Sequence, residues 1–99
     1  MARLRNIHPG EVLEEEFLKP LGISQYRLAK ETEIPQTRIS EIIKHRRGIT
    51  SDTALRFSKF FGTTPQFWLG LQTDYDLEEE KKRLRQTLKR IPKYEDVVK

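Results

Sequence analysis

The chain has 99 residues, enough for one domain with a single modest core. Its residues are 35% apolar and 34% charged, which predicts a thin core with a solvated or partner-binding extension. The sequence lacks cysteine, which excludes a disulfide framework and a thiol nucleophile, and no apolar run approaches the roughly 18 residues of a membrane span. We therefore expect a cytoplasmic protein without a membrane association. The net charge of +4 permits a polyanionic partner without demonstrating one.

Proline, glycine and capping residues along the first half of the chain predict helices. Residues 9–10 open the first helix, glutamates crowd its first turns, and Pro20 is expected to stop it with Gly22 just beyond. Ser24 is the expected N-cap of a second, short helix, and Pro35 begins the third. No segment alternates with period two for long enough to form a strand.

The second half of the chain predicts two further helices. Thr50 or Ser51 caps the fourth, in which small and aromatic residues recur at i, i+3, i+4 and i+7 over residues 54–61, and Gly62 ends it. The fifth begins at residues 64–65 and is the longest. We therefore expect an all-α bundle of five helices with an elongated last helix.

Aromatic side chains gather in the fourth and fifth predicted helices, and we expect them to form the core between these helices, with a dimer interface as the alternative. These residues are Phe57, Phe60, Phe61, Phe67 and Trp68. Because five small helices bury little surface, a symmetric homodimer would add stability. Its interface candidates are Leu71, Tyr75 and Leu77.

The C-terminal region divides into an acidic and a basic block. Residues 74–80 hold five acidic and no basic residues, and residues 81–90 hold six basic and no acidic ones. Glutamate–cation pairs at i,i+4, Glu78–Lys82 and Glu79–Arg83, favour a solvated helix, and a partner-binding arm is the alternative. Leu84, Leu88 and Ile91 form an apolar stripe. Three uses are open for it: packing on the domain, pairing with another protomer, or contact with a partner protein.

The predicted third helix, over about 35–44, has two contrasting faces. Ile39, Ile42 and Ile43 cluster within about 100° on a helical wheel, and the opposite side is polar. Only about three residues separate this helix from the one before it, over about 24–31, so the two must cross at a steep angle. That geometry exposes the second helix of the pair, so that it can enter the DNA major groove.

The polar face carries side chains suited to reading bases. Gln36 can hydrogen-bond the edge of adenine, and Arg38 can donate two hydrogen bonds to guanine. Thr37 can hydrogen-bond a base through its hydroxyl or contact a thymine methyl with its own methyl group. Glu41 can accept from cytosine, although its charge repels phosphates. A polar surface helix without a ligand is the alternative interpretation. The candidates for phosphate contact are Gln25, Ser40, Lys44, Arg46 and Arg47.

The stretch 24–42 resembles the helix-turn-helix of phage-repressor-like (Cro/C1-type) DNA-binding domains. The motifs around it are more specific in combination, over roughly residues 7–78. They read HPGE at 8–11, RGIT at 47–50, DTALR at 52–56, FGTTPQFWL at 61–69, LQ at 71–72 and YDL at 75–77. In this order they are similar to those of the HigA (VapI-like) antitoxin family.

This resemblance implies an all-α, five-helix repressor-like helix-turn-helix domain with an elongated C-terminal helix. It implies an antitoxin that binds operator DNA as a homodimer, neutralises a HigB toxin (a RelE-like ribonuclease that cuts mRNA on the ribosome) and represses its own operon. The family's reading helix falls on 35–44, with reading side chains at Gln36, Thr37, Arg38 and Glu41. The domain then covers 1–78, and 79–99 form a charged C-terminal helical extension.

One position departs from the usual helix-turn-helix pattern. The turn usually carries a glycine with positive φ, and here that position is Glu33. Either Glu33 adopts the left-handed conformation, at a cost of about 1 kcal/mol, or the turn has a different shape.

Other function classes receive less support. A free-standing phage-type repressor without a toxin partner fits the short chain, whereas an enzyme does not, because no catalytic constellation, phosphate-binding glycine loop or metal spacing is present. We therefore expect no catalytic residue, cofactor, metal or small-molecule substrate. His8 is expected to make a local hydrogen bond near the first helix.

Two charged segments leave alternatives open. The amphipathic stretch 81–91 permits contact with a membrane surface, but the acidic block before it opposes attraction to anionic lipid. The acidic face at 14–16 is either solvated or meets a basic toxin.

Overall fold

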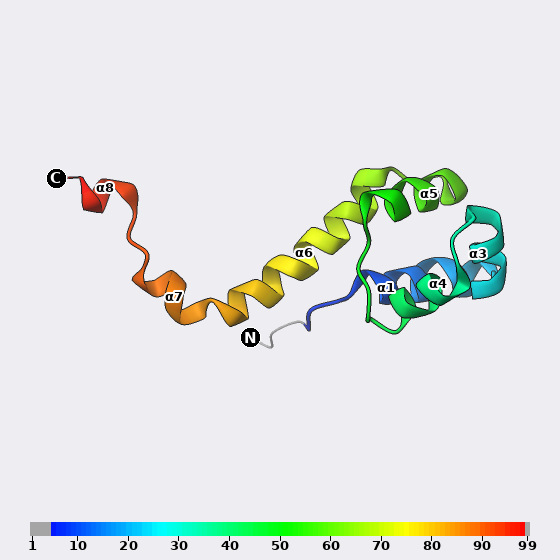
Figure 1. Ribbon diagram of the computed structural model, residues 1–99, viewed down its shortest axis with the longest axis horizontal. Helices are drawn as coiled ribbons and strands as arrows, with labels where there is room; N and C mark the ends of the chain where they lie inside the picture. Colours follow the sequence, from blue (N-terminus) through cyan, green and yellow to red (C-terminus); the bar gives the residue numbers. More distant parts are fainter. Residues whose placement is uncertain (1–4, 99) are drawn as a thin grey trace.

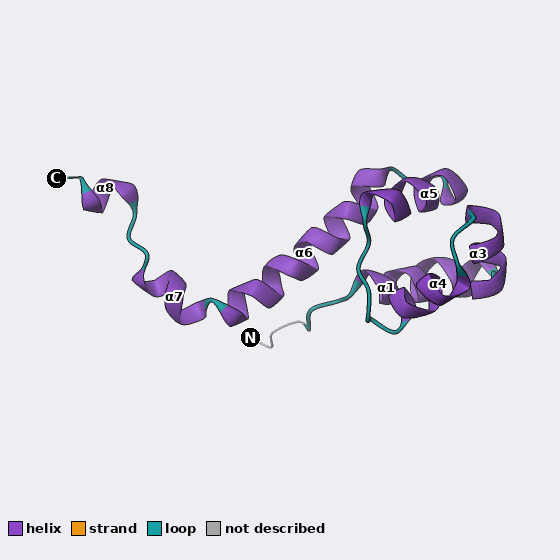
Figure 2. Ribbon diagram, in the orientation of Figure 1, coloured by secondary structure: helices purple, strands orange, loops and turns teal. Residues whose placement is uncertain are grey.

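The computed structural model describes residues 5–98, and these residues form helices joined by loops (Figures 1 and 2). The elements are α1 (Pro9–Val12), the π-helical η1 (Leu13–Leu18), α2 (Lys19–Leu21), α3 (Gln25–Thr32), α4 (Gln36–Ile43), α5 (Ser51–Phe61), α6 (Pro65–Arg83), α7 (Arg85–Arg90) and α8 (Tyr94–Val97). The all-α prediction is confirmed, with α1, η1 and α2 forming one first helix and α6 the long fifth one. Within residues 5–98, none of the helices combines the length and apolarity needed to cross a membrane.

Side-chain oxygens of Ser24, Thr50 and Thr64 cap the N-terminal ends of α3, α5 and α6, and the sequence predicts the first two of these caps. Ser24 Oγ accepts from the backbone N–H of Arg27 at 3.0 Å, and Thr64 Oγ1 accepts from that of Phe67 at 3.1 Å. Of the two candidates for α5, Thr50 is the cap, because its Oγ1 accepts from the N–H of Thr53 at 3.3 Å. Each cap satisfies a donor that has no partner within its helix.

The prediction that Pro20 stops the first helix is wrong. The helix passes through Pro20 and ends at Leu21, before Gly22 with φ of 65°. Proline has no N–H, and its ring clashes with the carbonyl four residues earlier in a regular α-helix. The chain widens into the π-helical η1 just before the proline, where the N–H of Lys19 bonds to the carbonyl of Glu14, five residues back. This wider turn lets the helix continue.

The core forms where α5 and α6 pack against the first helix, α3 and α4. Phe57 and Trp68 are fully buried, with ring centroids 5.1 Å apart in an edge-on arrangement. The indole Nε1 of Trp68 donates to Thr63 Oγ1 at 2.8 Å, so burial leaves its polar atom paired. The predicted aromatic core is confirmed for these two rings and for the half-buried Phe61, which packs on both of them, whereas Phe60 and Phe67 lie at its exposed margin.

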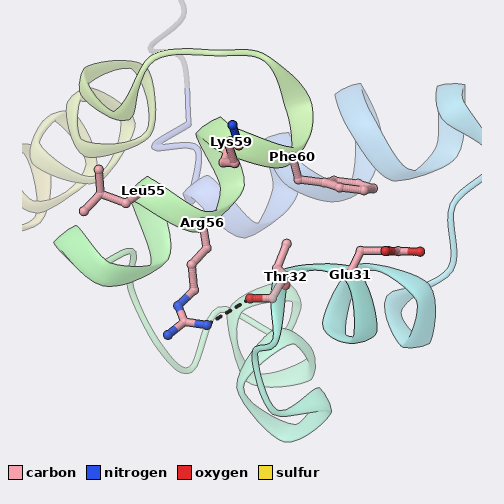
Figure 3. Close-up of a pocket in the computed structure, with 6 residues that line it drawn as sticks. All are labelled: Glu31, Thr32, Leu55, Arg56, Lys59 and Phe60. Atoms are coloured by element: carbon pink, nitrogen blue, oxygen red, sulfur yellow. Dashed lines mark hydrogen bonds between the residues drawn. The ribbon is translucent and has the colours of Figure 1, made fainter.

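The turn between α3 and α4 has the usual left-handed shape despite its glutamate. Glu33 has φ of 57° and ψ of 38°, and the N–H of Ile34 bonds back to the carbonyl of Ala29 at 3.1 Å. Arg56 of α5 donates from Nη1 to the carbonyls of Thr32 (3.0 Å; dashed in Figure 3) and Glu33 (2.9 Å). The C-terminal end of α3 is therefore closed by its own turn and by a side chain of α5.

The C-terminal part of α6, together with α7 and α8, projects from this body as an arm (Figure 1). The molecule measures 59 × 29 × 22 Å with a radius of gyration of 17.4 Å, whereas a compact domain of this length has about 13 Å. Ion pairs at i,i+3 span the acidic-to-basic junction of α6. They join Glu78 to Lys81, Glu79 to Lys82 and Glu80 to Arg83.

We expect Glu33→Gly to raise the free energy of unfolding by about 1 kcal/mol, because glycine has no Cβ to strain the left-handed turn. Urea denaturation followed by circular dichroism measures the change. Glu33→Ala is the matched control, since it removes the carboxylate and keeps the Cβ. A glycine variant no more stable than the alanine variant would contradict the assignment of strain to this position.

Candidate nucleic-acid interface

The packing of α4 determines which of its side chains reach solvent. Ile39 and Ile42 are fully buried against the core, so the helix cannot rotate without exposing them. Gln36 and Thr37 are exposed in the first turn, and the side chain of Arg38 is about one-third exposed. These three candidate reading residues therefore lie together at the N-terminal end of α4, the end that enters the major groove in helix-turn-helix proteins.

Glu41, the fourth candidate reading residue, is half-buried and paired with an arginine. Its Oε1 accepts from Arg47 Nε at 2.9 Å, which brings together the helix and the basic segment after it. The pair offsets the repulsion between Glu41 and a phosphate that the sequence alone suggests. It also leaves less of the positive charge of Arg47 available to a phosphate.

The remaining candidates for phosphate contact lie at helix ends, except Ser40, which is in the middle of α4. Lys44 and Arg46 are exposed just after α4, where the chain turns through His45 with φ of 64°. Ser40 is half-buried on α4, and Gln25 is the half-buried first residue of α3. Backbone N–H groups at a helix N-terminus attract anions, so the position of Gln25 agrees with its predicted use.

Sequence reasoning missed one charged residue beside this surface. Asp52, in the first turn of α5, accepts on Oδ1 from Arg56 Nε at 2.8 Å and from Arg38 Nη1 at 3.4 Å. The i,i+4 spacing of Asp52 and Arg56 was a visible signal, but nothing in the sequence places either near Arg38, 14 residues away from Asp52.

The C-terminal end of α4 packs closely against the start of α1. A Cβ added to Gly10 would lie 1.9 Å from the carbonyl oxygen of Ile42, so only glycine permits this contact. His8 is 4% exposed, and its Nδ1 accepts from the N–H of Gly10 at 2.9 Å, which confirms its predicted local hydrogen bond. Its ring stacks on His45 (4.6 Å, 14°) and meets Tyr75 of α6 edge-on (4.8 Å).

Burial of His8 lowers its pKa below the ordinary value of 6.5, and the charge of His45 lowers this pKa further. Asp76 acts in the opposite direction. Within residues 5–98, no group of three or more histidine, cysteine or acidic side chains is placed to hold a metal ion.

The three candidate interface residues of α6 occupy different environments. Leu71 packs against the core and is half-buried, and Tyr75 contacts His8. Leu77 is 55% exposed, farther along the arm. Leu71 and Tyr75 are thus at least partly used within the chain, whereas Leu77 offers most of its apolar surface to solvent.

Known proteins resemble this chain in sequence and in fold. The helix-turn-helix family model matches residues 15–68. Virulence-associated protein I of Dichelobacter nodosus is 54% identical over 72 residues, which cover 73% of this chain and 67% of that protein.

Two solved structures resemble the whole fold. An addiction module antidote protein of the HigA family from Coxiella burnetii superposes with a TM-score of 0.86 at 46% identity, covering 92% of this chain and 100% of the other. Pseudomonas aeruginosa antitoxin HigA, solved with the higBA promoter, has a TM-score of 0.85 at 33% identity, covering 91% and 98%.

We expect the free energy of unfolding to fall as the pH drops below about 6.5. The pKa of His8 is lower in the folded chain, so the unfolded chain binds a proton first and gains stability from it. Urea denaturation at intervals between about pH 7.5 and 5.5 measures the effect. His8→Asn, which keeps a capping oxygen near Gly10, is expected to flatten this dependence. An unchanged dependence in that variant would assign the effect to other groups.

Proposed function

Since this chain belongs to the HigA (VapI-like) family of helix-turn-helix proteins, we propose that it is an antitoxin that neutralises a HigB/RelE-like mRNA-cleaving toxin and represses its own operon. The observation behind the DNA-binding part is the presentation of α4, with its isoleucines buried and Gln36, Thr37 and Arg38 on the surface. The promoter complex of the related P. aeruginosa antitoxin supports the same assignment.

Sequence discrimination comes from the first turn of α4 in this proposal. Arg38 makes a bidentate hydrogen bond to guanine, and Gln36 makes one to adenine. Thr37 contacts a thymine methyl group or hydrogen-bonds a base through its hydroxyl. Glu41 has a smaller part, because its carboxylate is engaged by Arg47. In a homodimer, two copies of α4 enter successive major grooves about 34 Å apart on one side of the duplex.

Phosphate contacts supply most of the affinity in this proposal. Lys44 and Arg46 have the exposure and the charge for this role, and Arg47 contributes what its pair with Glu41 leaves free. Gln25 and Ser40 contribute neutral hydrogen bonds. Because each neutralised phosphate releases counterions, binding weakens steeply as the salt concentration rises.

The homodimer that this mechanism needs is proposed to form through α6. Leu77 is the best supported of the three interface candidates because it is exposed, whereas Leu71 and Tyr75 would contribute only their uncovered edges. We propose that residues 1–78 form the DNA-binding domain and 79–99 an extension, so that this interface lies at the end of the domain.

We expect Arg38→Ala to relax base preference at one position of each half-site, because a good bidentate pair discriminates by about 1–3 kcal/mol. Arg46→Ala, the matched control, is expected to weaken binding to all sequences alike and to reduce the salt slope by about one. Selection from a randomised duplex pool, followed by titrations at two salt concentrations, measures both effects. If Arg38→Ala selects the same operator as the unaltered chain, the reading face is misassigned.

We expect the small reading frame adjacent to the gene for this chain to arrest growth when expressed alone. Coexpression of this chain is expected to restore growth, and the two proteins are expected to copurify. An unrelated helix-turn-helix protein serves as the control for rescue. The absence of both arrest and complex would favour the free-standing phage-repressor-like regulator and would leave the DNA-binding proposal in place.

A further inference from the structure

We propose that Asp52 and Arg56 are positioning residues that hold the guanidinium of Arg38 ready for base reading. This inference rests on the reading role proposed above for α4. Its starting point is one oxygen: Asp52 Oδ1 accepts from Arg56 Nε at 2.8 Å and from Arg38 Nη1 at 3.4 Å. A carboxylate of α5 therefore joins the first turn of α4 to a second arginine.

Arg56 is itself fixed to the turn of the helix-turn-helix. Its Nη1 donates to the backbone carbonyls of Thr32 and Glu33 at 3.0 and 2.9 Å, and Figure 3 shows the guanidinium reaching from α5 toward the end of α3. Because backbone carbonyls move only with the main chain, their hydrogen bonds fix the position of the Arg56 guanidinium. The Nε of the same group then restrains the carboxylate of Asp52. The N-terminal turn of α5 adds a favourable field for the Asp52 carboxylate.

This anchoring limits the motion of Arg38 and engages only one of its nitrogens. A guanidinium has five N–H groups, and the contact with Asp52 occupies one nitrogen at the long end of hydrogen-bond range. The side chain is about one-third exposed, so the rest of its donors remain accessible to a base. Ordering a long side chain on binding costs affinity, and an arginine restrained beforehand loses less.

The same arrangement also offsets the negative charge of Asp52. A lone carboxylate next to Arg38 would repel the phosphates of bound DNA, but Asp52 lies between two guanidinium groups that together outweigh it. The pair with Arg56 is thus needed for Asp52 to restrain Arg38 without opposing DNA. Asp52 and Arg56 are therefore expected to affect discrimination at the base pair that Arg38 reads, and not the affinity for DNA of any sequence.

The test compares operator duplexes that differ only at the base pair assigned to Arg38 by the Arg38→Ala experiment. Asp52→Asn is expected to reduce discrimination at that base pair by about three- to tenfold, the scale for immobilising one side chain. Arg56→Lys keeps the charge but lacks the planar fork that reaches the carboxylate and both carbonyls, and it is expected to give the same loss. Glu15→Gln, which breaks the exposed i,i+4 pair with Lys19, is the matched control and is expected to leave discrimination at that base pair unchanged.

The double variant Arg38→Ala with Asp52→Asn separates a positioning role from a general loss of structure. If Asp52 acts through Arg38, the double variant discriminates no worse than Arg38→Ala alone. The inference is overturned if Asp52→Asn leaves discrimination unchanged while Arg38→Ala lowers it, or if Asp52→Asn raises discrimination at that base pair, which would mean that Asp52 withholds Arg38 from the base. If Arg38→Ala itself changes no preference, the reading role fails first, and this inference fails with it.

Discussion

The surface that this protein offers to DNA depends on the complete burial of Ile39 and Ile42. Removing either side chain from water is worth about 1.5–3 kcal/mol, so the two together fix the rotation of α4. The contact between Gly10 and the carbonyl of Ile42 then presses the end of the helix against α1, where no side chain intervenes. With one face and one end held in this way, the first turn of α4 has a single exposed orientation.

Two carboxylates on or beside this surface are paired with arginines. Glu41 is bonded to Arg47, and Asp52 lies between Arg56 and Arg38. Partly exposed pairs of this kind contribute little to stability, because water screens them. Their effect is on the charge that a duplex would meet, since an unpaired carboxylate there would repel phosphates. The basic character of the surface therefore depends on how its charges are paired as well as on how many there are.

Most of the fold could be predicted because its signals are local. Ser24, Thr50 and Thr64 lie within three residues of the N–H groups that they cap, and the isoleucines of α4 repeat at helical spacing. The passage of the first helix through Pro20 could not be predicted from residue type, because proline usually ends a helix. It depends on a change of hydrogen-bond register over the preceding turn, a choice between two backbone geometries that share the same sequence.

For the site, residue type and spacing within one helix were enough to predict the polar face of α4 and the basic segment after it. Which of these groups meet residues distant in sequence depends on how the helices pack. His8 stacks on His45 across 37 positions, and Asp52 reaches Arg38 from a different helix. Such pairs form because burial of the apolar faces brings α1, α4 and α5 together, and the ends of those helices then lie side by side whatever their separation along the chain.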